Sequence, residues 1–97
     1  MMRAMTLGEL VTPLQARLVG PDREFAGVST DSRSLREGEL FVALCGESFD
    51  GHDYLEQVAA SGAVAALVSR PQEIDLPQLQ VADTQAALGR LGAFNRQ

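Results

Sequence analysis

The segment from Leu40 to Val68 constrains the fold more than any other part of the sequence, because two apolar runs flank a helix-like stretch. The runs are Leu40–Cys45 and Ala63–Val68, and about six residues is a usual length for a strand buried on both faces. Between them, Asp53 occupies the position of a helix N-cap and Ser61-Gly62 that of a C-cap. This order predicts two parallel strands joined by a right-handed helical crossover, the βαβ unit of α/β folds.

Capping and periodicity patterns predict two further helices. Thr6 and Glu9 have the spacing of a capping box, so a helix should begin there and end near Pro13. Asp83 should cap a final helix. The side chains expected to face the core from the helices after Asp53 and Asp83 are Tyr54, Leu55, Val58, Ala59, Ala87, Leu88, Leu91 and Phe94.

Three short segments predict the remaining strands, at Arg17–Val19, Phe25–Val28 and Leu76–Val81. The last alternates like a half-exposed strand, and Pro77 should place its start near a sheet edge. Taken together, the elements predict an α/β fold, a small mixed β-sheet with one βαβ unit and packed helices.

Composition and charge exclude several classes of function. A chain of 97 residues is expected to form a single domain, spanning 1–97. The net charge of −5 argues against nucleic acid and against an anionic membrane as partners. No signal-peptide pattern is present, and no apolar run approaches the ~20 residues of a membrane span. The single cysteine, Cys45, lies in an apolar run. We therefore expect a cytoplasmic protein with a buried free thiol.

All eight basic residues are arginine, and the absence of lysine limits the chemistry of the chain. A phosphate loop of the G-x-x-x-x-G-K-[ST] type is excluded, as is a lysine acting as Schiff base or general base. The sequence stops at Gln97 without a closing glycine or helix C-cap, so we expect it to be part of a longer protein.

Two polar loops follow strands that are predicted to be neighbours, and they form the candidate binding site. Ser29–Arg33 offers hydroxyls, backbone N–H groups and one guanidinium, which suit a diphosphate. Gly46–His52 contains two glycines, which let a ligand approach the backbone closely, and Phe49, which can stack on a base or fill the edge of the core. Because ligands of α/β sheets bind beyond the carboxyl ends of the strands, both loops should contribute to one pocket.

The competing interpretation of the first loop is a plain turn. In it, Asp31 closes an Asx-turn and Arg33 pairs with Glu37 or Glu39. The local sequence by itself favours this turn, and only the predicted proximity of the second loop raises the binding interpretation.

No catalytic or metal-binding set is predicted. Cys45 and His52 are the residue types of a nucleophile and its base, but the sequence places one at the end of a core strand and the other at a helix start. Asp50, His52 and Asp53 are close in sequence, yet no second histidine or cysteine accompanies them to complete a structural metal site.

The combination of these motifs resembles the N-terminal domain of the bacterial Mur ligases over nearly the whole chain, and most firmly from about Val28 to Leu91. The pattern T-D-S-R followed by G-x-L-F-V-A-L-x-G-x-x-F-D-G-H-D is specific when its parts occur together. The segments that carry it are Ser29–Arg33, Gly38–Tyr54 and Gly62–Val68. Within the family, Phe49–Asp53 favours the branch that adds D-alanyl-D-alanine to UDP-N-acetylmuramoyl-tripeptide over the branch that adds the third amino acid.

The resemblance implies a three-domain, ATP-dependent peptidoglycan-precursor ligase of which only the first domain is present. That domain would bind the uridine diphosphate (UDP) part of a UDP-N-acetylmuramoyl-peptide. ATP and Mg²⁺ would belong to the central domain, and the incoming amine to the C-terminal domain. The partners implied are thus the nucleotide precursor and the two other domains of the same chain.

The residues that match the family's nucleotide-contacting loops are Thr30, Asp31, Ser32, Arg33, Gly46, Glu47, Ser48 and Phe49. No catalytic residue, metal or cofactor is expected in this part of the ligase, and the chain alone is expected to be inactive. A protein-docking module with the same fold and no nucleotide site is the alternative from a different class.

Overall fold

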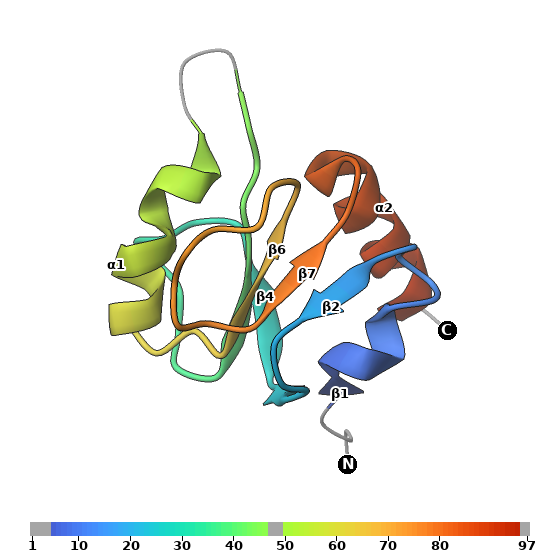
Figure 1. The fold of residues 1–97 in the computed structure, drawn as a ribbon, viewed down its shortest axis with the longest axis horizontal. Coiled ribbons are helices and arrows are strands. Elements are labelled where there is room, and N and C mark those ends of the chain that lie inside the picture. Colours follow the sequence, from blue (N-terminus) through green and yellow to red (C-terminus); the bar gives the residue numbers. More distant parts are fainter. Residues whose placement is uncertain (1–4, 47–49, 96–97) are drawn as a thin grey trace.

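A mixed β-sheet forms the middle layer of the molecule (Figure 1). The computed structural model describes residues 5–46 and 50–95. Within them the sheet consists of β2 (Arg17–Val19), β4 (Gly27–Ser29), β5 (Glu39–Val42), β6 (Ala65–Val68) and β7 (Gln78–Gln80). Their order is β2-β7-β6-β5-β4. The four strands β7, β6, β5 and β4 are parallel to one another, whereas β2 runs antiparallel to β7.

The predicted βαβ unit is present at the centre of this sheet. β5 and β6 are parallel neighbours, with Leu40 opposite Ala65. The 3-10 helix η2 (Gly51–Tyr54) and the α-helix α1 (Leu55–Ala60), which continues it directly, join the two strands. Gly62 follows α1 with a φ of +105°, a conformation that favours glycine, so the predicted C-cap is confirmed.

Helices lie on both faces of the sheet, which gives three layers (Figure 1). α1 covers one face, while η1 (Leu7–Leu10) and α2 (Thr84–Asn95) cover the other. Since side chains alternate along a strand, β5 directs Leu40 into the core under η1 and α2, and Phe41 into the core under α1. The buried residues on the α1 side are Phe41, Ala43, Leu55, Val58, Ala63, Ala66, Val68 and Leu76. Those on the α2 side are Leu7, Leu10, Leu14, Phe25, Leu40, Val42, Ala65, Leu67, Leu79, Val81, Ala87 and Leu91.

The two predicted helix starts outside the βαβ unit are confirmed. The Thr6 N–H donates to Glu9 Oε2 at 3.4 Å, so the capping box is formed, although η1 is a short 3-10 helix that ends at Leu10. At α2, Asp83 Oδ1 accepts from the Gln85 N–H at 2.9 Å, which makes Asp83 the cap. The side chain of Phe94, predicted to face inward, lies outside the described residues.

Two predicted strands differ from the structure. Phe25–Val28 is not one strand but parts of two, because the chain turns at the exposed Ala26. β3 (Glu24–Phe25) pairs with β1 (Met5–Thr6) in a separate two-stranded antiparallel sheet, whereas β4 pairs with β5.

β7 is not at a sheet edge, because β2 returns antiparallel along its outer side. Pro77 precedes the paired residues and so costs no ladder hydrogen bond within them. The buried Gln78 side chain is satisfied by backbone: its Oε1 accepts from the Gln72 N–H at 2.7 Å and its Nε2 donates to the Gln72 carbonyl at 2.9 Å. An alternating strand can therefore be buried on both faces.

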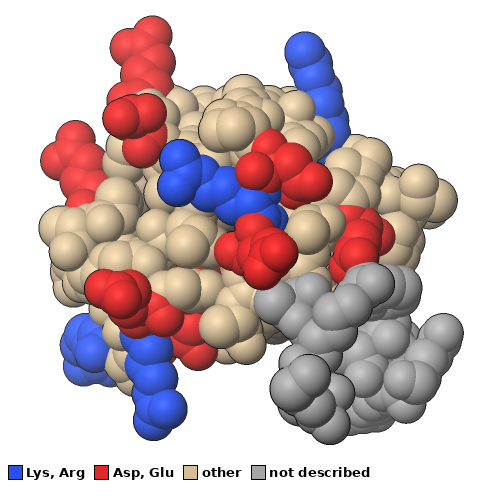
Figure 2. All heavy atoms as spheres, turned by 90° about the horizontal axis from the view of Figure 1, so that it is seen from below, with Lys and Arg blue, Asp and Glu red and all other residues tan. Residues whose placement is uncertain are grey.

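The surface carries charges of both signs. On the face drawn in Figure 2, acidic side chains are interspersed with basic ones over the described residues. No helix in the described ranges is long and apolar enough to span a membrane.

Candidate functional site

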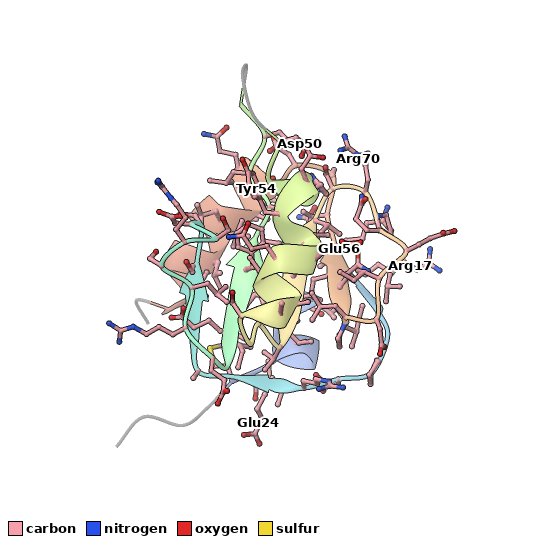
Figure 3. All side chains as sticks on the ribbon, turned by 90° about the vertical axis from the view of Figure 1, so that its left-hand side faces the viewer. Arg17, Glu24, Asp50, Tyr54, Glu56 and Arg70 are labelled. Carbon is pink, nitrogen blue, oxygen red and sulfur yellow. The ribbon has the colours of Figure 1, made fainter. Side chains whose placement is uncertain are left out.

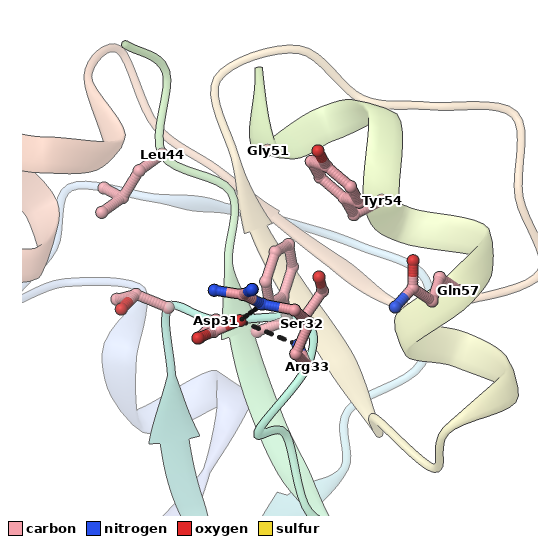
Figure 4. A pocket seen from close by; sticks show the side chains of 9 residues that line it. Asp31, Ser32, Arg33, Leu44, Gly51, Tyr54 and Gln57 are labelled. Atoms are coloured by element: carbon pink, nitrogen blue, oxygen red, sulfur yellow. Dashed lines mark hydrogen bonds and ion pairs between the residues drawn. The ribbon is translucent and has the colours of Figure 1, made fainter. Parts of the chain in front are cut away.

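A hollow of about 630 Å³ opens between the loop after β4 and the helical segment η2–α1, and we call it the β4–α1 hollow (Figure 4). It is lined by Thr30, Asp31, Ser32, Arg33, Phe41, Leu44, Gly51, Tyr54 and Gln57. Its size falls within the range of roughly 300–1,000 Å³ that is usual for small-molecule sites. β4 and β5 are adjacent and parallel, so the hollow lies at the carboxyl ends of neighbouring strands, as predicted.

The first predicted loop forms one wall of the hollow, with all four of its matched residues, Thr30 to Arg33, among the lining. Its backbone is held locally: Asp31 Oδ1 accepts from the Arg33 N–H at 2.8 Å, and the Asp31 N–H donates to Ser29 Oγ at 3.2 Å. The Asx-turn of the competing interpretation is thus present. Turn and binding wall are compatible, since the turn fixes the loop that faces the hollow.

Arg33 supplies the cationic group of this wall among the lining residues. Its Nε lies 3.4 Å from Asp31 Oδ1, and its side chain is 86% exposed. The ion partner is therefore Asp31, and Glu37 makes no ion pair with Arg33; Glu39 instead accepts from the Arg36 N–H at 2.7 Å. The Arg33 backbone N–H, and more weakly its guanidinium, lower the pKa of Asp31. Most of the guanidinium remains available to a ligand anion.

The second predicted loop is described only at its ends. Gly46 is exposed and does not line the hollow, while Glu47, Ser48 and Phe49 lie outside the described residues. Leu44 and Gly51, on either side of this loop, both line the hollow. The Gly51 N–H donates to the Leu44 carbonyl at 2.7 Å, and a Cβ at Gly51 would lie 2.8 Å from the Leu44 backbone nitrogen and oxygen. This close approach requires glycine.

Tyr54 and Gln57 form the opposite wall, and neither was predicted there. The sequence pattern assigned Tyr54 to the inward stripe of the helix, but 41% of the residue is exposed, whereas Leu55 and Val58 are buried. The error follows from the helix start: η2 begins at Gly51, capped by Asp50 and not by Asp53, so the inward face is rotated. The spacing of Tyr54 and Gln57, three residues apart on the outward face, is the signal that could have found them.

A second polar cluster centres on Asp50 at the carboxyl ends of β5 and β6, and Figure 3 shows Asp50 and Arg70 together there. Asp50 Oδ1 accepts from the His52 N–H at 2.9 Å, from His52 Nδ1 at 2.7 Å and from Cys45 Sγ at 3.2 Å. Asp50 Oδ2 accepts from Arg70 Nη2 at 2.6 Å. His52 backbone donation and the Arg70 guanidinium hold the pKa of Asp50 well below its ordinary value.

This cluster corrects two predictions about Cys45. The thiol is exposed, not buried, because β5 ends at Val42 and the chain has left the core by residue 45. Its Sγ also lies 3.6 Å from His52 Nδ1, although the sequence placed the two apart. The hydrogen bond to Asp50 raises the pKa of the thiol, so the thiolate that a nucleophile needs is disfavoured.

Cys45, Asp50 and His52 also have ligand-type atoms within 4.8 Å of one another, but both imidazole nitrogens of His52 already have hydrogen-bond partners. The Ser69 N–H donates to His52 Nε2 at 3.1 Å, so the proton of a neutral ring resides on Nδ1, which donates to Asp50. A metal at Nδ1 would have to displace that proton and oppose the ion pair with Arg70. We therefore assign the cluster a structural role in joining the ends of β5, η2 and β6.

Comparison with known sequences finds relatives of one kind, the Mur ligases. Residues 24–96 match the sequence profile described as "Mur ligase family, catalytic domain". The chain is 52% identical over 96 residues to the UDP-N-acetylmuramoyl-tripeptide--D-alanyl-D-alanine ligase of Escherichia coli (strain K12), covering 99% of this chain and 21% of that protein. It is 37% identical over 92 residues to the UDP-N-acetylmuramoyl-L-alanyl-D-glutamate--2,6-diaminopimelate ligase of Bacillus cereus, covering 93% and 19%. The chain thus spans about a fifth of the length of these relatives.

Solved structures extend the likeness to the fold. The structure titled "Crystal structure I of MurF from Acinetobacter baumannii" superposes with a TM-score of 0.87 at 40% identity, over 97% of this chain and 21% of that one. MurF ligase from Thermotoga maritima in complex with ADP gives a TM-score of 0.59 at 32% identity over 66% of this chain and 15% of that one. The α/β fold with its mixed sheet is confirmed by these neighbours.

Proposed function

Because the chain belongs to the Mur ligase family, we propose that it is the substrate-binding domain of a peptidoglycan-precursor ligase and holds the UDP end of a UDP-N-acetylmuramoyl-peptide. The relatives from Escherichia coli and Bacillus cereus act, by name, on UDP-N-acetylmuramoyl precursors. The domain division is part of the proposal: residues 1–97 form the N-terminal domain, and an ATP-binding and a C-terminal domain complete the enzyme.

The observation that carries the proposal is the β4–α1 hollow beside Thr30–Arg33. A nucleoside diphosphate needs a cation and fixed hydrogen-bond donors for its phosphates and a flat apolar surface for its base. The cation and the donors are offered by the Arg33 guanidinium and the hydroxyls of Thr30 and Ser32 on one wall, and the flat apolar surface by the exposed ring of Tyr54. The matched residues Gly46, Glu47, Ser48 and Phe49 belong to the same proposal as a second contact loop.

Identity favours the branch of the family that adds D-alanyl-D-alanine. The chain is 52% and 41% identical to two ligases of that name and 37% identical to one that adds 2,6-diaminopimelate. We accordingly propose UDP-N-acetylmuramoyl-tripeptide as the precursor. The diaminopimelate-adding activity is the second candidate.

The amide-forming chemistry is proposed to lie outside this chain, in a cytoplasmic parent enzyme. The sequence has no lysine and therefore no G-x-x-x-x-G-K-[ST] loop to hold the phosphates of ATP, so ATP with its Mg²⁺ is proposed to bind in the central domain. What the chain's own residues do is bind and orient the nucleotide handle. The 97-residue chain alone is then expected to catalyse no ATP-dependent ligation.

Titration with UDP, followed by backbone-amide NMR, tests the proposed function. We expect concentration-dependent shifts confined to residues 29–33, 44–52 and 54–57, and Arg33→Gln should weaken binding about ten-fold because a charge-assisted phosphate contact is lost. The exposed Arg90→Gln in α2 is the matched control and should bind like the wild type. Absence of shifts at millimolar UDP would contradict the proposal and favour the protein-docking alternative.

A further inference from the structure

Two side chains on the wall opposite Arg33 have no structural task that accounts for them. Tyr54 is the large hydrophobic residue that the described part of the chain leaves exposed, at 41%. The Gln57 side chain makes no hydrogen bond within residues 5–46 and 50–95. Both line the β4–α1 hollow, and Figure 4 shows them projecting from the helical segment toward the loop that carries Asp31–Arg33. A planar apolar face and an unpaired amide thus border one cavity.

The backbone that carries these two side chains is fixed on its other side. Leu55 and Val58 each follow one of these two residues in the sequence. Both are buried in the core between α1 and the sheet. The start of η2 is held by the Asp50 cap and by the Gly51–Leu44 backbone hydrogen bond. Tyr54 and Gln57, three residues apart, therefore face the hollow from a rigid support, as a preorganised recognition surface requires.

We propose that Tyr54 and Gln57 are the residues that recognise the base of the bound nucleotide, Tyr54 by stacking on its face and Gln57 by hydrogen bonding to its edge. This inference rests on the proposed function and adds to it the source of base specificity. The edge of uracil has an N–H donor between two carbonyl acceptors, and a primary amide offers one acceptor and two donors, so the two fit side by side. The phosphates then extend toward Arg33 across the hollow.

The test is a UDP titration observed on both molecules. Stacking on an aromatic ring moves the uracil H5 and H6 resonances upfield through the ring current. We expect this upfield shift with the wild type and with Tyr54→Phe, and its loss with Tyr54→Ala together with a fall in affinity of about ten-fold or more. Gln57→Leu should lower UDP affinity about three- to ten-fold while the upfield shift persists at saturation. A folded control is Glu56→Gln, which Figure 3 shows on the other side of the same helix.

The outcomes separate the two proposals. If the wild type binds UDP, and Arg33→Gln weakens that binding, but the uracil protons do not move upfield or Tyr54→Ala binds as tightly as wild type, base recognition by Tyr54 is wrong and the proposed function stands. Unchanged UDP affinity in Gln57→Leu removes Gln57 from the assignment. If the wild type shows no binding at millimolar UDP, the proposed function fails and this inference fails with it. Because both side chains are exposed, the variants should melt at the wild-type temperature. A melting curve of each variant checks this and excludes unfolding as the cause of weaker binding.

Discussion

Asp50 accepts hydrogen bonds from three residues and in this way joins three parts of the chain. Its carboxylate contacts Cys45 beyond β5, His52 in η2 and Arg70 beyond β6. Cys45 and Asp50 also form an isolated antiparallel bridge. One carboxylate therefore closes the loop between residues 45 and 50 and starts the helical segment that carries Tyr54.

Asp50→Ala is expected to destabilise the fold by about 1–2 kcal/mol at neutral pH, since an N-cap and its charged partners are lost. The pKa of Asp50 is depressed below its ordinary value of 3.8 in the folded chain. Its stabilising effect is thus complete above that value and is lost as the pH falls below it. Urea unfolding should show the difference between wild type and Asp50→Ala at pH 7 and its decline toward pH 3.

Asp53→Ala is the matched control, because Asp53 is exposed in the same turn and is not the cap. Its stability should stay within about 0.5 kcal/mol of wild type. Equal losses in the two variants, or a difference at pH 3 as large as at pH 7, would argue against the role assigned to Asp50.

The helices differ in what their glycines do. Gly51 begins η2 where the helical segment touches the backbone of Leu44, and a Cβ there would lie 2.8 Å from two backbone atoms. Gly89 is an exposed interior residue of α2, and a Cβ there would meet nothing within 4 Å. The first glycine permits a contact between elements, while the second only weakens a helix.

Alanine substitution should therefore have opposite effects at these two positions. Gly51→Ala is expected to lower stability by about 1–3 kcal/mol, because two backbone segments must separate. Gly89→Ala is expected to raise it by up to about 1 kcal/mol, the difference in helix propensity. In thermal denaturation, a shift of about 4–8 °C per kcal/mol is expected for a domain of this size. Changes of the same sign at both positions would contradict the assignment.

The whole molecule is organised by a sheet that is buried on both faces. The clusters under α1 and α2 share β5 and β6, whose residues from Leu40 to Val42 and from Ala65 to Val68 are buried throughout. The radius of gyration of 12.1 Å is close to the roughly 13 Å expected for a folded chain of about 100 residues. Because the two cores meet in the same strands, we expect them to unfold together.

Hydrogen exchange tests this coupling. The amides of β5 and β6 should exchange most slowly, and those of the two-stranded sheet β1–β3 most quickly. Leu67→Ala, in the core under α2, should cost about 2–5 kcal/mol and reduce protection equally in α1 on the opposite face. Protection lost on the α2 side alone would mean that the two cores unfold separately.

The sequence determined the features that depend on local chemistry or on the spacing of apolar residues. Continuous apolar runs of about six residues are typical of strands covered on both faces, and the caps at Thr6, Asp83 and Gly62 use side chains or conformations suited to those positions. The βαβ unit, the mixed sheet and the grouping of Thr30–Arg33 at a strand end followed from these. The assignment of Gly46–Phe49 to the binding site stays a prediction.

Tertiary structure alone decided where elements distant in sequence meet. β7 lies inside the sheet because β2, about 60 residues earlier in the sequence, pairs with its outer side. No local pattern encodes that pairing. Asp50 became the cap in place of Asp53 because Leu44, Arg70 and Ser69 converge there, and that shift rotated Tyr54 out of the core. Local propensity sets where an element begins to within a few residues, but long-range packing sets its face, and the face decides which side chains reach the hollow.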